Sequence, residues 1–434
     1  MPDSWIWNPR VESMPKENIR KIQLEKLKET VYRLYNVEYY HRKMKEVGLK
    51  PDDIKTLSDL RKLPFTTKDD LRECQPYSHI AVALSDIVEV HGTSGTTGEP
   101  IFQYYTQRDI ENWSELMARS LAAAGLTKRD VIQITPSFSL FTGGFGFFYG
   151  ARKIGAFIVP TGPGYSKRQI YVMVKLGTTM IAGVANYALR LAEAAYEMGI
   201  DPAKDTKVRK GVFGAEMWSD SLRRKIESIW NMESFDIYGM AELYGPGTAI
   251  DCQYHNGLHV WEDHYIVEVV DPKTGDVLEP EEKGELVITT LTKDAVPLIR
   301  YRTRDISRIL DTKTCDCGRT HIKIDRIQGR TDDMFIINGV NVWPSAVEEV
   351  LLKEPLIAPY YQIVIDRQDA LDRMTVFVES VKPLNSFEKE ALEKKLQRDL
   401  KETIIVTPIV KIVDAGTLPR FDGKPKIVID KRSI

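Results

Sequence analysis

The sequence has little cysteine and no long apolar run. Four cysteines among 434 residues are too few for the disulfide framework of a secreted domain. No stretch of about 18 uncharged apolar residues occurs, which argues against a membrane-spanning helix. The first residues, MPDSW, do not have the basic and then apolar order of a secretory signal. We therefore predict a cytoplasmic protein.

The sequence also lacks an excess of charge of either sign. Sixty Lys and Arg residues oppose 62 Asp and Glu residues, which gives a net charge of −2 at pH 7. Such a balance offers no long-range attraction to nucleic acid or to an anionic membrane, so we expect neither as a partner. Hydrophobic residues make up 43% of the chain, enough to bury a core and to exclude intrinsic disorder.

Short apolar runs alternate with helical patterns between residues 130 and 250. The runs are VIQIT, AFIVP, TMIAGV, KGVFGA and FDIYG, and their alternation with helices predicts a mostly parallel sheet. Residues 264–310 contain strands joined by turns, which predict an antiparallel, barrel-like subdomain. Apolar residues at helical spacing over residues 15–48 predict one or two amphipathic helices.

The polar segment GRTDDM, residues 329–334, separates this large part from a smaller one. The pattern beyond it predicts a helix opened by Pro344, and then further strands and one more helix. They lie at 344–354, 359–366, 373–380, 386–403 and 408–414. We therefore predict an α/β fold with an N-terminal domain at 1–330, which has mostly parallel sheets and the barrel-like subdomain, and a small α+β domain at 331–434.

Residues 91–100, HGTSGTTGEP, form a loop of small residues. Glycines open backbone conformations closed to other residues, and hydroxyl and N–H groups can then surround an anion such as a triphosphate. The loop lacks the Gly-x4-Gly-Lys-Ser/Thr spacing of a P-loop and carries Glu99. Its composition alone fits a flexible surface turn equally well.

Further motifs follow this loop in a fixed order. The motifs are FTGG at 141–144, GAE at 214–216, YGMAE at 238–242, WEDH at 261–264, YRTRD at 301–305, GRTDDM at 329–334, INGVNVWPSAVEE at 337–349 and LPRFDGKPK at 418–426. The set resembles the ANL superfamily of adenylate-forming enzymes and, within it, the phenylacetate–CoA ligase family, from about residue 20 to the end of the chain.

The resemblance implies a reaction in two halves. A small-molecule carboxylic acid attacks the α-phosphorus of ATP in the presence of Mg²⁺, and the thiol of coenzyme A then displaces AMP. Because the first half brings two anions together, it requires cations and aligned donors. The resemblance also extends to adenylyltransferases that act on a deazaflavin coenzyme, and it allows a homodimer. A catalytically idle nucleotide-binding protein is a third reading, which the joint presence of Lys424, Glu242 and Asp305 disfavours.

The resemblance assigns the nucleotide site. The phosphate loop is Thr93, Ser94, Gly95, Thr96, Thr97 and Gly98. Glu242 corresponds to the acid that holds Mg²⁺, a hard ligand for a hard cation. Tyr238 corresponds to the aromatic residue on adenine, in a motif that continues through Gly239, Met240 and Ala241. Gly214, Ala215 and Glu216 line the base. Asp305 binds the ribose hydroxyls, with an ion pair to Arg302 or Arg304 as the alternative, and Arg330 lies near the phosphate or ribose.

Three residues of the C-terminal part carry the implied movement of that domain. Lys424 corresponds to the lysine that reaches the α-phosphate during adenylation, although Lys426 stands two residues away. Asp332 corresponds to the hinge about which the small, mobile domain rotates between the half-reactions. That rotation brings the loop of Gly339 to the coenzyme A entrance.

The segments expected to line the acyl pocket depart from the phenylacetate pattern. Relatives have Pro-Ser-Tyr where this chain has Ala185-Asn186-Tyr187, and they have a Tyr-rich stretch before FTGG. Four phenylalanines near that motif are able to surround an aryl ring, and core packing is the alternative for each. They are Phe138, Phe141, Phe145 and Phe148.

Three of the four cysteines lie in one region of the sequence. Cys252, Cys315 and Cys317, together with a histidine, have the composition of a Cys₃His zinc site, and some members of the family carry such a set. His259 is the predicted fourth ligand, with His255 and His321 as alternatives. We expect structural Zn²⁺ that holds two loops together, while Cys74 stands apart.

Overall fold

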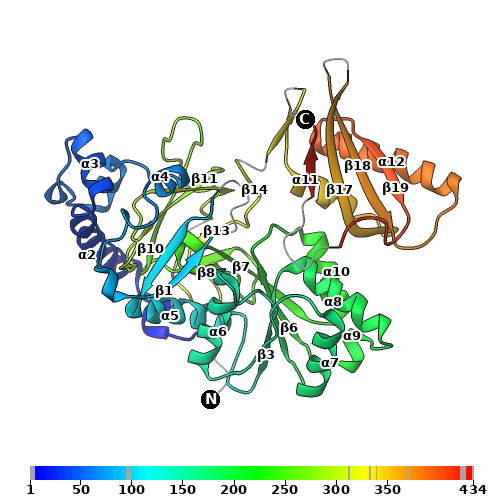
Figure 1. Ribbon diagram of the computed structural model, residues 1–434, viewed down its shortest axis with the longest axis horizontal. Helices are drawn as coiled ribbons and strands as arrows, with labels where there is room; N and C mark the ends of the chain where they lie inside the picture. Colours follow the sequence, from blue (N-terminus) through cyan, green and yellow to red (C-terminus); the bar gives the residue numbers. More distant parts are fainter. Residues whose placement is uncertain are drawn as a thin grey trace.

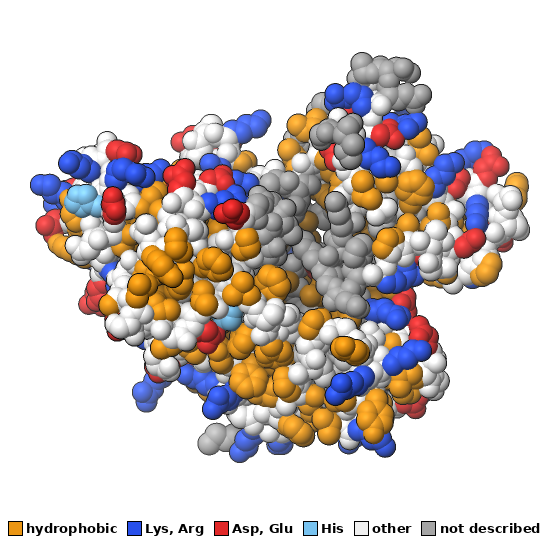
Figure 2. All heavy atoms as spheres, in the orientation of Figure 1, with side chains coloured by type: hydrophobic (Ala, Val, Ile, Leu, Met, Phe, Trp, Pro, Cys, Tyr) orange, Lys and Arg blue, Asp and Glu red, His pale blue; other side chains and the backbone are white. Residues whose placement is uncertain are grey.

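The computed structural model describes residues 5–93, 99–310, 313–331, 334–338, 340–368, 371–420 and 427–432. A larger unit and a smaller one lie side by side (Figure 1). Charged side chains of both signs are spread over the face in Figure 2, consistent with the net charge of −2. No helix within these residues is long and apolar enough to cross a bilayer.

An eight-stranded sheet forms the centre of the larger unit. Its strand order is β13-β9-β8-β7-β6-β5-β3-β4. Neighbours from β4 to β7 are parallel, which confirms the predicted βα alternation, and the three remaining strands add antiparallel. The strands are β3 (Val131–Ile134), β4 (Phe157–Pro160), β5 (Met180–Gly183), β6 (Lys210–Gly214), β7 (Glu233–Met240), β8 (Gly245–Ile250), β9 (Leu258–Val260) and β13 (Lys323–Ile324).

Helices cover both faces of this sheet. Successive strand residues point to opposite faces: Ala182 and Val212 pack in the core beneath α5 and α6, whereas Ile181 and Phe213 pack with α7, α8 and α10. The α5 helix begins at Gln107, where Thr106 and Asp109 form a capping box. The helices are α5 (Gln107–Ala123), α6 (Thr142–Ile154), α7 (Ser166–Leu176), α8 (Ala185–Glu197), α9 (Pro202–Asp205) and α10 (Asp220–Trp230).

A second sheet forms the predicted antiparallel subdomain. Strands β10 (Tyr265–Val270), β11 (Gly284–Thr290), β12 (Tyr301–Ser307) and β14 (Gly329–Arg330) pair in that order, all antiparallel. Two helices, α2 (Lys16–Leu34) and α3 (Glu38–Glu46), confirm the amphipathic segment predicted near the N-terminus. Their apolar sides share a core with Leu291 and Ile299.

Short elements complete the larger unit. The hairpin of β1 (Ile87–Gly92) and β2 (Phe102–Thr106) brackets the predicted phosphate loop. This unit also contains two short helices, α1 (Pro9–Glu12) and α4 (Lys68–Glu73). A 3₁₀ turn at Ala241–Leu243, called η4, follows β7. Other 3₁₀ turns lie at Pro51–Asp53, Leu57–Lys62 and Leu84–Asp86.

The smaller unit has its own sheet and its own core. The strand order is β19-β18-β17-β20, and the first three of these strands and both helices confirm the predicted elements. The core of this unit draws on residues from Phe335 to Ile412. The elements are β15 (Phe335–Ile337), β16 (Val340–Val342), α11 (Pro344–Leu351), β17 (Ile357–Gln368), β18 (Leu371–Ser380), α12 (Ser386–Ile404), β19 (Ile409–Val413) and β20 (Val428–Asp430).

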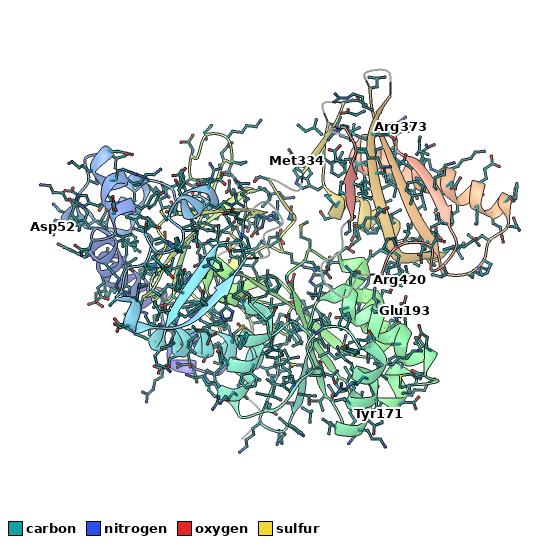
Figure 3. All side chains as sticks on the ribbon, viewed as in Figure 1. Asp52, Tyr171, Glu193, Met334, Arg373 and Arg420 are labelled. Carbon is teal, nitrogen blue, oxygen red and sulfur yellow. The ribbon has the colours of Figure 1, made fainter. Side chains whose placement is uncertain are left out.

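Polar contacts hold the two units together along α8 and α10. The Glu348 carboxylate accepts a hydrogen bond from the Ser219 N–H at 3.0 Å, and Lys225 Nζ donates to the Ile357 carbonyl at 3.1 Å. Arg420 lies close to Glu193 of α8 (Figure 3), with 4.0 Å between the charged groups. The smaller unit is therefore docked on the helical face of the larger one.

Candidate active site

The predicted nucleotide segments lie at the carboxyl ends of neighbouring parallel strands. Gly214 ends β6, and Tyr238 stands near the end of β7, the edge at which open α/β sheets bind ligands. Gly214 has to be glycine, because a Cβ there would lie 2.3 Å from the Ile237 carbonyl oxygen. Ala215 then turns the chain with a φ of 67°. The backbone therefore passes close beside β7 before it turns.

Tyr238, Asp305 and Arg330 form one hydrogen-bonded group. The hydroxyl of Tyr238 donates to Asp305 Oδ2 at 2.7 Å, and Arg330 Nη1 donates to Oδ1 at 3.1 Å. Burial raises the pKa of Tyr238 well above its usual value, so this phenol stays a donor. Asp305 faces Arg330 because β12 pairs with β14 at these two residues. Three residues of the predicted nucleotide site are thus brought together.

The alternative ion pairs predicted for Asp305 are wrong. Arg302 instead bonds Glu285 from β11, and Arg304 lies 3.5 Å from Asp69. Side chains alternate along β12, with Tyr301, Thr303 and Asp305 buried and the arginines between them less so. The period of two places both arginines on the face opposite Asp305.

Glu242 lies in the turn η4 and is 2% exposed. Tyr301 donates to its Oε1 at 3.1 Å, and Lys68 Nζ lies 3.7 Å from the same oxygen. Within the described part of the chain, both polar contacts of this carboxylate involve Oε1, which leaves Oε2 for a cation. Such a carboxylate fits Mg²⁺, which prefers oxygen ligands.

Sequence reasoning missed the two residues that hold Glu242. Tyr301 shares the buried face of β12 with Asp305, so the period of two along YRTRD was a signal for it. Lys68 comes from a distant segment, where Thr66 forms a bridge to Tyr301 and places α4 beside the site. Nothing in the local sequence of Lys68 points to Glu242.

The described ends of the phosphate loop are tied together. Thr93 N donates to the Ile101 carbonyl, and Ile101 N donates to Thr93 Oγ1, each at 3.0 Å. Five members of the predicted loop and three residues of the C-terminal part lie outside the described residues, and their roles stay predictions. They are Ser94, Gly95, Thr96, Thr97, Gly98, Asp332, Gly339 and Lys424.

The predicted acyl-pocket segment contacts the nucleotide segment directly. Glu216 Oε1 accepts hydrogen bonds from the backbone N–H and the side-chain amide of Asn186, at 2.8 and 3.1 Å. Phe138, Phe145 and Phe148 contact one another edge to face or through Tyr149. Phe141 is the N-cap residue that precedes α6 and is 44% exposed. Three of the four phenylalanines therefore form one aromatic cluster.

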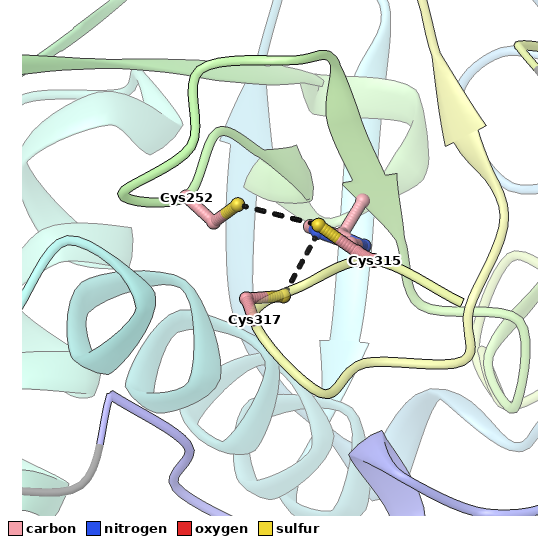
Figure 4. A group of neighbouring side chains, drawn as sticks. Cys252, Cys315 and Cys317 are labelled. Atoms are coloured by element: carbon pink, nitrogen blue, oxygen red, sulfur yellow. Dashed lines mark hydrogen bonds between the residues drawn. The ribbon is translucent and has the colours of Figure 1, made fainter. Parts of the chain in front are cut away.

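The thiols of Cys252, Cys315 and Cys317 converge with His259 (Figure 4), and all four ligand atoms lie within 4.8 Å of one another. Cys252 and Cys315 Sγ are 3.9 Å apart, and Cys317 Sγ lies 3.4 Å from His259 Nε2. Ligand atoms around a tetrahedral zinc ion are about 3.5–3.8 Å apart. The group therefore has the donors and the spacing that fit Zn²⁺.

The electrostatics of this cluster favour the thiolate form at Cys315 and Cys317, whose pKa values are lowered, while the hydrogen bond to Cys317 raises the pKa of Cys252. Hydrogen bonds from Cys252 and His259 lower the pKa of Cys317 to about 2, and zinc binds the thiolate form of cysteine. The alternative histidines are occupied elsewhere: His255 lies 2.7 Å from Asp251, and His321 accepts from the Glu262 N–H. His259 is thus the histidine of the cluster.

Comparison with known proteins identifies the family. The sequence profile of the AMP-binding enzymes matches residues 22–291, and that of the AMP-binding enzyme C-terminal domain matches residues 339–432. Phenylacetate–coenzyme A ligases of Aromatoleum evansii and Escherichia coli K12 are each 40% identical to this chain. The alignments cover 97% and 98% of it, and 96% and 97% of the relatives. The Thermus thermophilus ligase is 38% identical over 98% of this chain and 100% of its own.

Solved structures show the same fold. A 2-hydroxyisobutyryl-CoA ligase in its postadenylation state superposes with a TM-score of 0.93 at 27% identity, covering 100% of this chain and 94% of the other. The same ligase in its thioesterification state gives 0.74 at 28% identity with the same coverage. These relatives are CoA ligases, so the adenylyltransferase reading is not favoured. The chain belongs to the phenylacetate–CoA ligase family of the AMP-binding enzymes and is an AMP-forming acyl-CoA ligase.

Proposed function

We propose that this ligase activates phenylacetate or a related aryl or small organic acid. The observation that carries this proposal is the 38–40% identity to phenylacetate–coenzyme A ligases over nearly the whole chain. The aromatic cluster around Phe138, Phe145 and Phe148, at the start of α6, supports an aryl group. Asn186, held by Glu216, stands in the segment that departs from the phenylacetate pattern, and it is where a different acid would be selected.

We infer the following roles for the nucleotide site. Tyr238 stacks on adenine while its hydroxyl orients Asp305, and Asp305 then accepts hydrogen bonds from the ribose hydroxyls. Arg330 fixes the second oxygen of that carboxylate. The residues at 214–216 line the base, and the loop of Thr93 surrounds the phosphates. Glu242 would hold Mg²⁺, and the ion would neutralise charge that develops on the phosphates.

We also infer that the smaller unit acts as a mobile domain, with its boundary at residues 330/331 and its hinge at Asp332. In the docked arrangement Lys424 supplies a positive charge to the carboxylate and the α-phosphate while pyrophosphate leaves. Rotation then withdraws Lys424 and presents the loop of Gly339 to coenzyme A, whose thiolate displaces AMP from the acyl carbon. The greater similarity to a postadenylation state than to a thioesterification state supports a first-half arrangement here.

The remaining assignments belong to the same proposal. Structural Zn²⁺ bound by Cys252, His259, Cys315 and Cys317 would hold the loop after β8 to the loop that follows β12. We assign the protein to the cytoplasm, because free thiols such as its own persist in a reducing compartment. A homodimer is the assembly that the family suggests.

The test is AMP release from ATP, Mg²⁺ and coenzyme A with a panel of acids. The panel contains phenylacetate, indoleacetate, benzoate, 2-hydroxyisobutyrate and short unbranched acids at matched concentrations. We expect the highest kcat/KM with an aryl acid. A clear preference for a hydroxy or unbranched acid would overturn the aryl assignment without affecting the ligase assignment. AMP release that requires no coenzyme A would contradict the second half-reaction.

A further inference from the structure

The turn that carries Glu242 is held by side chains at every one of its carbonyl groups. Four successive backbone oxygens, from residue 241 to residue 244, each accept a hydrogen bond from a buried side chain. Tyr105 donates to those of Ala241 and Tyr244 at 3.3 and 2.7 Å, Lys293 to that of Glu242 at 2.8 Å, and Tyr265 to that of Leu243 at 2.7 Å. Such complete side-chain support indicates that the position of this turn is strongly specified.

Lys293 is the charged member of this set and is 1% exposed. Burial of an ammonium group is costly unless hydrogen bonds and nearby negative charge offset it. Its Nζ donates to the Gln103 side-chain oxygen at 2.7 Å and to the Glu242 carbonyl. The rings of Tyr105 and Tyr244 lie 5.4 and 5.8 Å from the same nitrogen, within the range of a cation–π contact. The ammonium therefore has a built site.

The two acceptors of Lys293 come from the two parts of the predicted ATP site. Gln103 lies in β2, the strand by which the chain returns from the phosphate loop, and Glu242 lies in the turn between β7 and β8. One nitrogen thus joins both parts. Tyr244 has a φ of 93°, a backbone conformation that persists only when its surroundings enforce it.

We propose that Lys293 is a positioning residue for adenylation. It fixes the Glu242 backbone relative to Gln103 on β2, so that the Glu242 carboxylate meets the metal–nucleotide complex in one arrangement. In this role Lys293 acts through Glu242 rather than by its own contact with ATP or acid. This inference rests on the proposed role of Glu242 as the Mg²⁺ ligand. Partners that orient a ligand from behind it change metal affinity roughly 10- to 100-fold when removed.

The experiment measures metal binding without turnover. Mn²⁺ affinity is determined by electron paramagnetic resonance in the presence of α,β-methylene-ATP, and AMP affinity is determined by calorimetry without metal. The variants are Lys293→Met, Glu242→Gln and the matched control Lys26→Met. Lys26 is a half-buried lysine whose Nζ donates to the Asp263 carbonyl at 2.7 Å, and this bond does not involve η4. Gln103→Met removes the side-chain acceptor of Lys293. It takes the place of Lys293→Met in the comparison if Lys293→Met does not fold.

We expect Lys293→Met to weaken Mn²⁺ binding roughly 10- to 100-fold with AMP affinity unchanged, and Lys26→Met to change neither. Gln103→Met should weaken Mn²⁺ binding in the same direction. Equal losses of Mn²⁺ and AMP affinity in Lys293→Met would overturn the positioning role, because they indicate general damage. Native Mn²⁺ affinity in Lys293→Met together with a loss in Glu242→Gln would overturn it while leaving Glu242 as the ligand. Native affinity in Glu242→Gln would instead overturn the role of Glu242.

Discussion

Tyr238 and Asp305, which stand 67 positions apart in the sequence, share a hydrogen bond of 2.7 Å between the phenol and the carboxylate. The bond joins the end of the parallel sheet to the antiparallel subdomain. Arg330 binds the other carboxylate oxygen, so the orientation of Asp305 is fixed from two sides. A residue that stacks on the base would thereby also set the carboxylate that binds the sugar.

Replacement of Tyr238 by Phe keeps the ring and removes this bond. We expect ATP binding to weaken by about 1–2 kcal/mol, or roughly five- to thirtyfold in Kd, because Asp305 loses its hydrogen bond from Tyr238. Calorimetry with a nonhydrolysable ATP analogue measures this. Tyr40→Phe is the control, since it removes a buried phenol that hydrogen-bonds to Thr66 and Pro297 rather than to Tyr238, Asp305 or Arg330. An unchanged Kd for the ATP analogue in Tyr238→Phe would contradict the role of the Tyr238 hydroxyl in orienting Asp305.

Metal analysis of the purified protein tests the cysteine cluster. We expect about one zinc per chain, and a Cys317→Ser variant that loses it and unfolds at least about 5 °C lower, because metal binding adds to folding stability. Cys74→Ser is the matched control, because Cys74 is a buried free thiol outside the cluster. Well below one zinc per chain in the native protein would refute the zinc site.

The docked arrangement of the two units predicts that replacement of Glu348 slows the first half-reaction but not the second. This buried carboxylate accepts hydrogen bonds from Ser219 N–H and from the Tyr361 hydroxyl at 3.2 Å. Loss of about 1 kcal/mol of docking shifts a two-state equilibrium roughly fivefold. Glu348→Ala should therefore slow acid-dependent pyrophosphate release while thioester formation from added acyl-adenylate stays native.

Glu349→Ala provides the control for that prediction. Glu349 is the next residue on α11, and its contact with Ser221 is longer, at 3.4 Å. We expect nearly native rates in both half-reactions. Equal slowing of the two half-reactions by Glu348→Ala would mean that Glu348 supports the fold rather than the docked arrangement.

Lys424 and Lys426 are distinguished by the first half-reaction. Removal of a positive charge that stabilises the negative charge developing in a transition state lowers the rate about 100-fold or more. Lys424→Ala should show this loss in acid-dependent pyrophosphate release and should still convert added acyl-adenylate to thioester. Lys426→Ala should remain close to native. The reverse result would assign the role to Lys426.

We predict that the charged side chain of His255 stabilises the fold to an extent that depends on pH. Hydrogen bonds to Asp251 and then to Glu233 raise its pKa to about 9, whereas an unfolded chain has about 6.5. A raised folded-state pKa means that the contribution is fully present below about pH 6.5 and is lost as the pH rises through 9. His255→Gln should therefore be less stable than the native protein by about 1–2 kcal/mol at pH 6, after allowance for solvent screening.

Denaturant unfolding of both proteins at pH 6 and at pH 10 measures this difference. We expect the stability gap between native protein and His255→Gln to close at the higher pH. A gap of the same size at both pH values would show that the histidine contributes through packing and not through its charge.

Local patterns in the sequence were sufficient for most of the fold. The βα alternation predicted β3 to β7, and the strands joined by turns predicted β10 to β12. They missed β20, because three residues are too short for a periodic pattern and their partner β17 lies about 60 residues earlier. The hairpin of β15 and β16 was missed because its strands are equally short.

Motifs in the sequence predicted Tyr238, Asp305 and Glu242 as members of the candidate site, and the structure brings Tyr238 and Asp305 into contact. Lys293 was not, because lysine is rarely buried and its acceptors, Gln103 and Glu242, come from other parts of the chain. The choice among three histidines for the cysteine cluster also depended on tertiary structure. Spacing allowed His255, but its imidazole is directed to Asp251.

The sheet of the smaller unit anchors both neighbours of the segment at 421–426. Arg420 binds Glu379 on β18, and the Ile427 carbonyl accepts from Ile363 N–H on β17. Both described ends of the segment are therefore fixed to the same sheet. A segment held at both ends keeps the groups that it carries at a high effective concentration in the active site when the sheet is docked there, and at a low one when it is not. With Lys424 in its proposed role, the rate of the first half-reaction would therefore depend on the position of the sheet, because docking of the smaller unit sets the local concentration of the lysine.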